Sequence, residues 1–209
     1  MAYNREHREE EVGRDTEENV YSEQGRSNLL AAGEIDSAEY GVMRGYEESP
    51  AEKVVKDYEV AELRVWSPAF KDREELPGKY TCDDINVNPP LTIEDVPDEA
   101  KSLAIIFEDV DSKYGDFTHW LLFNVDPEMN EIGEDSSPGI EGVNSFGGEE
   151  YRGPCPESGR HRYVFNVYAL NQSLDLGSEA SKEEVEQSMT PHIVAEGSLT
   201  GFYERSGKV

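Results

Sequence analysis

The pattern of hydrophobic and polar positions divides the chain into a polar first quarter and a strand-rich remainder. Residues 1–48 contain few long aliphatic side chains, so we expect a largely disordered, acidic N-terminal segment. Ser49, Pro50 and Glu52 then form a capping box with proline at the first helical position, which predicts a short helix over residues 50–58. We therefore place one domain over residues 49–209, with strand-like patterns from about residue 59.

Three short apolar runs predict the central strands of that domain. They cover residues Leu103–Phe107, Trp120–Val125 and Tyr163–Leu170. Each run is rich in aromatic or β-branched residues and is bounded by polar and turn residues, as buried strands are. A second capping box starting at Ser181 predicts a helix ending near Met189, and a partly alternating run predicts a last strand over Ile193–Tyr203. The pattern indicates a mostly β domain with a few short helices, closer to a β-sandwich than to an alternating β/α fold.

Titratable side chains lie beside the ends of these runs. Asp109 lies just past the first run and His119 just before the second, so a hairpin of the two runs brings both to one end of the sheet. His161 precedes the third run and joins them if that run is parallel to the second. Tyr163, two residues further on, points to the same face. We therefore expect one carboxylate, two imidazoles and one phenol to share a site.

The loop that carries His161 is unusually basic for this chain. Residues 151–163 contain three arginines and one histidine, whereas the whole chain has a formal net charge of -27. The simplest explanation is a site for a small anion at the mouth of a β-sheet. Imidazolium, phenol and backbone donors would hold a phosphate-like group, with Asp109 orienting a histidine. A two-His-one-carboxylate metal site and general acid–base catalysis remain open for the same residues.

The acidity of the chain restricts its partners. It contains 46 Asp and Glu residues against 19 Lys and Arg residues. We favour adaptation to a high-salt, halophilic cytoplasm, where screening removes the self-repulsion and solvated carboxylates keep the protein soluble. A partner with a basic surface is the alternative. Nucleic acid and anionic membranes are poor partners in either case.

Several common sites and segments are not indicated. No apolar run approaches the ~20 residues of a membrane span, and the polar N-terminus shows no secretory signal, so we expect a soluble cytoplasmic protein. No phosphate-binding loop, dinucleotide-binding glycine pattern or nucleophile elbow around Ser158 is present, and no cofactor is expected. Cys82 and Cys155 form no C-x-x-C pair. We expect small buried thiols rather than a disulfide, although the sequence leaves open whether the two meet.

Four linked segments resemble one protein family. They read LPGKYTCDDINVNPPL, SLAIIFEDVDSKYGDFTHWLLFNV, GVNSFGGEEYRGPCPESGRHRYVFNVYAL and PHIVAEGSLTGFYER. In this order and spacing they are similar to the phosphatidylethanolamine-binding protein family, in its bacterial and archaeal Raf kinase inhibitor-like branch. The resemblance runs from about Val60 to Arg205. It implies an antiparallel β-sandwich with a small anion pocket at one edge.

The resemblance also implies which residues line that pocket. It places them at Asp109, His119, Gly153, Pro154, His161 and Tyr163. The chain departs from the family pattern where Val110 and Lys113 replace two prolines of one motif and Glu157 replaces a proline of another. The first change predicts a looser pocket lip, and the second places a negative charge near an anion site. For Arg162 we expect a structural role in which it pairs with a buried acid, with Asp111 as the candidate.

We therefore predict a binding module for a small anion, phosphate or a phosphoester head group, and not an enzyme. The alternatives are a metal- or His-dependent phosphoester hydrolase using the same pocket, and an acidic protein-interaction scaffold. The family name implies regulation of kinases or, in some members, of proteases, but nothing in this chain identifies such a target. A homodimer is compatible with flat sheet faces, although no residue requires one.

Overall fold

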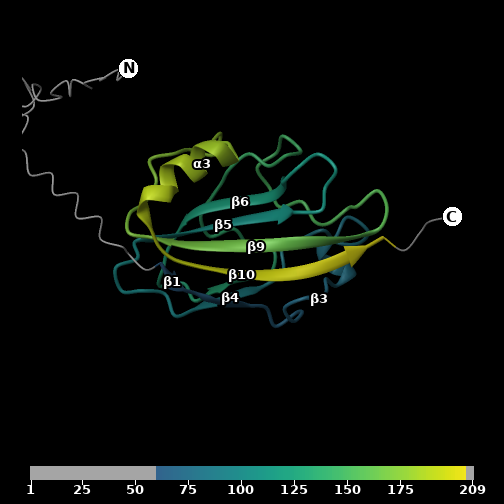
Figure 1. Ribbon diagram of the computed structural model, residues 1–209, viewed down its shortest axis with the longest axis horizontal. Coiled ribbons are helices and arrows are strands. Elements are labelled where there is room, and N and C mark those ends of the chain that lie inside the picture. The colour runs from purple at the N-terminus through teal and green to yellow at the C-terminus, as the bar shows by residue number, and fades with distance from the viewer. Residues whose placement is uncertain (1–59, 206–209) are drawn as a thin grey trace, which may run out of the picture. The chain divides into compact units, whose positions relative to one another are not determined.

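A seven-stranded sheet forms the centre of the protein in the computed structural model, which describes residues 60–205 (Figure 1). The predicted disordered segment and the predicted helix at 50–58 lie outside the described residues. Six strands follow the order β1-β10-β9-β5-β6-β8, and β3 also pairs with β10. Their bounds are β1 Ala61–Glu62, β3 Glu74–Glu75, β5 Ser102–Asp109, β6 Phe117–Val125, β8 Ile140–Glu141, β9 Arg160–Leu170 and β10 Ile193–Glu204.

A smaller three-stranded sheet covers one face of the large sheet. It has the order β2-β4-β7, and its strands pair antiparallel. Their bounds are β2 Arg64–Trp66, β4 Leu91–Glu94 and β7 Glu131–Ile132. A 3-10 turn, η1 at Gly78–Tyr80, lies in the connection between β3 and β4. The two sheets make the β-sandwich that the sequence predicts.

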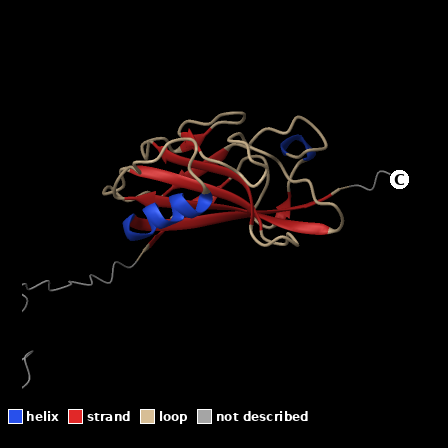
Figure 2. Cartoon of the chain, turned by 90° about the horizontal axis from the view of Figure 1, so that it is seen from above, coloured by secondary structure: helices blue, strands red, loops and turns tan. Residues whose placement is uncertain are grey.

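Strand β5 shows why the central runs contain so few polar residues. Leu103, Ile105 and Phe107 pack into the core between the two sheets. Ala104 and Ile106 point to the other face, where they pack beneath helix α3. Because successive strand residues alternate between faces, a strand covered on both sides needs apolar residues at every position. The continuous apolar pattern of β5 therefore reflects three layers: the small sheet, the large sheet and helix α3. Figure 2 shows the helix and the strands from above.

Helix α3 at Lys182–Met189 covers the outer face of the large sheet (Figure 1). The Ser181 side chain accepts a hydrogen bond from the backbone of Glu184, whose own side chain accepts one from the backbone of Ser181, so the predicted capping box is confirmed. Val185 and Met189 bury the inner side of the helix. The chain then passes through a 3-10 turn, η2 at Thr190–His192, into β10. Within the described part of the chain, no helix has the length and apolar character to cross a membrane.

The strand register brings distant segments to one edge of the large sheet. β5 pairs antiparallel with both β6 and β9, so these two neighbours of β5 run parallel to each other, which is the arrangement that brings His161 to the same end as His119. Asp109, at the end of β5, lies opposite Phe117 on β6 and opposite Tyr163 on β9. The sheet is not purely antiparallel, because the short strands β1 and β3 pair with β10 in parallel. The end of β5 and the starts of β6 and β9 therefore share one edge.

Candidate functional site

A hollow of about 360 Å³ opens at this edge of the sheet. Its walls come from the end of β5, the β5–β6 loop, the first residues of β6 and the loop before β9. The lining residues are Asp109, Asp111, Ser112, Lys113, Tyr114, Phe117, His119, Phe146, Cys155, Pro156, Glu157, Ser158 and His161. Three of the four residues expected to share a site, namely Asp109, His119 and His161, therefore line one cavity.

Asp109 and His161 form a direct pair across the strands. The Nδ1 atom of His161 lies 2.8 Å from Oδ2 of Asp109. The Asp109 side chain is almost fully buried, while the imidazole is partly exposed. Oδ1 of Asp109 also accepts the backbone N–H of Asp111 at 3.0 Å, which fixes the carboxylate at the turn after β5. The carboxylate is therefore fixed by the fold and in turn orients the ring of His161.

His119 is held by the loop before β9. Its Nδ1 atom lies 2.6 Å from the carbonyl oxygen of Arg152, so Nδ1 carries the proton that this oxygen accepts. The side chain is buried among aromatic rings, including those of Phe107, Phe117 and Phe146. Burial lowers the pKa of His119 from its ordinary value of 6.5, although the Arg152 carbonyl acts against this shift. The ring is therefore neutral at pH 7, with Nε2 as a hydrogen-bond acceptor.

Tyr163 lies beneath the hollow rather than in its wall. It is wholly buried, and its ring contacts both imidazoles, with centroids 5.4 Å from His119 and 6.4 Å from His161. Burial raises the pKa of the phenol strongly, and the nearby charge of Asp109 raises it further. The hydroxyl lies near the Asp109 carboxylate and the backbone of Cys155, although it meets neither at standard hydrogen-bond geometry within residues 60–205.

Gly153 and Pro154 do not line the hollow, contrary to the expectation from the resemblance. Both are buried behind its wall. A Cβ atom on Gly153 would lie 2.2 Å from the carbonyl oxygen of Tyr80, and the Gly153 N–H donates to Oδ1 of Asn86 at 2.8 Å. The carbonyl of Pro154 accepts the N–H of Cys82. Gly153 and Pro154 therefore pack the loop before β9 against residues 80–86, and the close contact at position 153 leaves room only for glycine.

Arg162 pairs with Asp111, but the acid is exposed rather than buried. The guanidinium donates to both carboxylate oxygens, at 2.7 and 2.9 Å, and the Arg162 backbone N–H donates to Oδ2 at 2.8 Å. The hydrogen bond from the guanidinium lowers the pKa of Asp111. The carboxylate is able to stay in solvent because it lies at the turn after β5, in the exposed part of the hollow's lining. The contact joins the β5–β6 loop to β9.

The sequence interpretation missed the aromatic and charged rim of the hollow. Phe117 and Phe146 meet edge to face at 4.9 Å and close one side, while Tyr114 is largely exposed at the mouth. On the rim, Nζ of Lys113 lies 2.5 Å from Oε2 of Glu157. The departures from the family motifs at positions 113 and 157 were visible in the sequence. Their pairing was not, because it depends on the approach of two loops.

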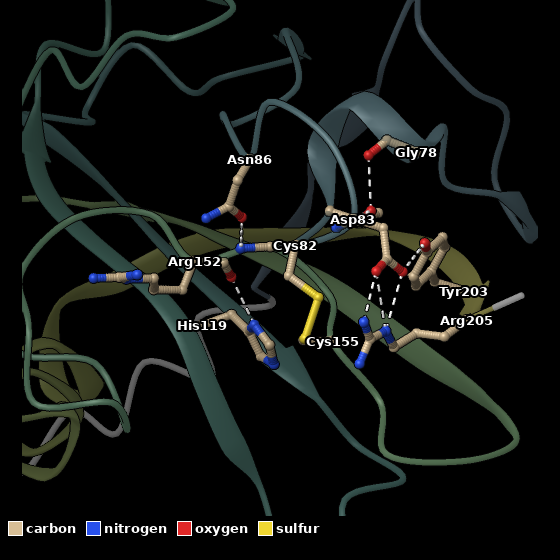
Figure 3. The surroundings of a disulfide bond; sticks show 11 residues. Gly78, Cys82, Asp83, Asn86, His119, Arg152, Cys155, Tyr203 and Arg205 are labelled. Carbon is tan, nitrogen blue, oxygen red and sulfur yellow. Dashed lines mark hydrogen bonds and ion pairs between the residues drawn. A yellow bond between two sulfur atoms is a disulfide. The ribbon is translucent and has the colours of Figure 1, made fainter. Parts of the chain in front are cut away.

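Cys82 and Cys155 form a disulfide, which corrects the expectation of two buried thiols (Figure 3). Their Cα atoms lie 5.4 Å apart, within the range of such bonds. Cys155 is exposed and lines the hollow, and His119 lies beside the bond in Figure 3. The bond reinforces the contacts at Gly153 and Pro154. Together they fix the loop that carries the pocket wall.

A metal centre is not assembled by this geometry. Between residues 60 and 205, no group of three or more His, Cys, Asp and Glu side chains is arranged to hold a metal ion. Asp109 and His161 contact each other, and Nδ1 of His119 faces a carbonyl oxygen instead of a shared centre. The arrangement offers hydrogen-bonding nitrogens around a small hollow.

The fold and the site define a β-sandwich protein with a small hollow at one edge of its large sheet. The sequence profile described as phosphatidylethanolamine-binding protein matches residues 66–204, well over half of the chain. The chain belongs to this family. A UPF0098 protein of Methanothermobacter thermautotrophicus is 45% identical over 145 residues, which cover 66% of this chain and 95% of the relative. A UPF0098 protein of Aquifex aeolicus is 40% identical over 152 residues, covering 68% and 89%.

Solved structures support the same assignment. A phosphatidylethanolamine-binding protein homologue from Chlamydia trachomatis has a TM-score of 0.67 and 35% identity, over 69% of this chain and 99% of that chain. YbcL of E. coli, described as a member of the mammalian PEBP family, has a TM-score of 0.65 and 27% identity, over 70% and 100%. Both solved structures are described as homologues or members of the phosphatidylethanolamine-binding protein family, and the two UPF0098 names state no activity.

Proposed function

We propose that the hollow binds inorganic phosphate or the phosphate of a phosphoester. The observation that carries this proposal is the use of Nδ1 in both imidazoles. Nδ1 of His161 faces Asp109 and Nδ1 of His119 faces the Arg152 carbonyl, which leaves Nε2 of each ring for a ligand. Both rings belong to one cavity of a size suited to a small molecule.

The two imidazoles have different roles in this proposal. His119 is neutral at pH 7, so its Nε2 accepts the proton of a hydrogen phosphate. His161 offers its Nε2 to the anion while its Nδ1 is held by the Asp109 carboxylate. Tyr163 supports the site from below, because its buried ring contacts both imidazoles. The mechanism is reversible binding without a covalent step.

A titration with inorganic phosphate tests this function. The imidazole nitrogen signals of His119 and His161 should shift on addition of phosphate at constant ionic strength, while His192, which does not line the hollow, serves as an internal reference. The His161→Ala variant should lose the response, and His192→Ala should keep it. No response at high millimolar phosphate would contradict the proposal. Turnover of an aryl phosphate that Asp109→Asn abolishes would favour the hydrolase alternative instead.

Partners and location remain predictions. Regulation of a kinase or a protease rests on the family resemblance alone, and a homodimer is only compatible with flat sheet faces. A cytoplasmic location also stays a prediction, and the disulfide is in tension with it because most cytosolic proteins keep their thiols reduced. Capture of one partner that is lost on deleting residues 1–50 but kept in His161→Ala would support the scaffold alternative.

A further inference from the structure

An ion pair bridges the mouth of the hollow. Lys113, in the β5–β6 loop, and Glu157, in the loop before β9, both line the cavity, and their charged atoms lie 2.5 Å apart. Nζ of Lys113 also lies 5.0 Å from the ring centroid of Tyr114. The hydrogen bond with Glu157 raises the pKa of Lys113. The two side chains therefore meet in the wall of the cavity that both imidazoles line.

The charges of the lining give Lys113 a special position. It is the only lysine or arginine among the side chains that line the hollow. The acidic lining residues are Asp109, Asp111 and Glu157. Asp109 faces His161 and Asp111 is neutralised by Arg162, which leaves Glu157 as the acid that competes for the lysine. The cavity can offer a full, permanent positive charge to an anion only if Lys113 leaves Glu157.

Opening this pair costs little. The Lys113 and Glu157 side chains are 60% and 72% exposed. Solvent screens such a pair, and holding two long side chains together costs conformational entropy, so exposed pairs contribute little to stability. A phosphate dianion in the hollow offers the lysine a stronger partner than a single carboxylate does. The lysine is long and flexible enough to change partners without a movement of the backbone.

We propose that Lys113 leaves Glu157 to bind the phosphate dianion, and that Glu157 sets the affinity by competing for Lys113. The inference rests on the proposed anion-binding function and adds two residues that set affinity and charge selectivity. Asp109, His119 and His161 form the inner part of the site, and the rim pair adjusts how strongly a doubly charged ligand is held. Glu157 thereby limits occupancy by weakly bound anions.

Calorimetric titration of the full chain with inorganic phosphate at pH 8 tests the inference. Glu157→Gln should tighten binding about two- to fivefold, since it releases the lysine from an exposed pair. Lys113→Met should weaken binding about three- to tenfold, since it removes a charge-assisted contact. Glu74→Gln is the matched control, because Glu74 forms an exposed pair with Lys71 and does not line the hollow. It should stay within about twofold of the wild type.

The outcomes separate the rim pair from the site beneath it. If the wild type binds and His161→Ala does not, the function stands. An unchanged affinity in either Glu157→Gln or Lys113→Met then overturns the rim inference alone. An equal gain in Glu74→Gln also overturns it, because the effect would come from the net charge of the chain. If the wild type itself binds no phosphate, the function and the rim inference fail together.

Discussion

Loss of the Cys82–Cys155 disulfide should lower the stability of the domain substantially. The bond closes a loop with a sequence separation of 73 residues. In the chain-entropy description, such a crosslink removes about 15 cal/mol/K from the unfolded chain, or about 4 kcal/mol at 25 °C. Three hydrogen bonds hold the same loops together in either redox state: Cys82 N–H to Pro154, Gly153 N–H to Asn86, and Tyr151 O–H to Tyr80. We therefore expect a folded but weakened reduced protein.

Denaturant unfolding of the oxidised wild type and of the Cys82→Ala/Cys155→Ala variant measures this loss. Trp120 is fully buried and reports the unfolding by its fluorescence. Unfolding free energies should be compared rather than midpoints, because a crosslink also changes the compactness of the unfolded state. A reductant should destabilise the wild type by a similar amount and leave the double variant unchanged. Equal free energies for the two proteins, at one ionic strength, would refute the reasoning.

Three further predictions follow from the site and the surface. Between pH 7 and pH 5 the unfolding free energy of His119→Asn, which can keep the bond to the Arg152 carbonyl, should fall less than that of the wild type. Burial lowers the folded-state pKa of His119, so the unfolded wild-type chain takes up a proton first as the pH falls through 6.5, and the folded state loses stability. An identical pH profile in urea unfolding would contradict this. Tyr163→Phe should keep or raise the unfolding free energy, by up to about 1 kcal/mol, because the buried hydroxyl makes no hydrogen bond of standard geometry among the described residues. A large loss of stability would count against it. Raising NaCl from 0.1 to 1 M shortens the screening length from about 10 to about 3 Å and should raise the midpoint temperature of thermal unfolding, because the repulsion among the carboxylates is screened. A fall in that temperature would contradict the high-salt interpretation of the net charge of -27.

Much of the fold follows from local patterns in the sequence. The runs that became β5, β6 and β9 are recognisable because a strand covered on both faces is apolar at every position. The register then places Asp109 beside Tyr163, and the antiparallel pairing of β5 with both neighbours brings His119 and His161 to the same edge. The capping box at Ser181 is equally local, and it is confirmed.

The remaining features depend on how loops approach one another. No spacing rule shows that the loops of Cys82 and Cys155 meet, since their separation along the chain says nothing of their distance in space. The backing role of Gly153 depends on its close contact with Tyr80, and the pairing of Lys113 with Glu157 depends on two loops closing over the hollow. The short parallel strands β1 and β3 have only two residues each, too few to show a period.

A crystal of the protein soaked in phosphate tests the central claim most directly. The account predicts tetrahedral density in the hollow within hydrogen-bond distance of Nε2 of both His119 and His161, with Lys113 turned from Glu157 toward the ligand. An empty hollow at high phosphate, or an anion held elsewhere on the surface with both imidazoles unchanged, would contradict it.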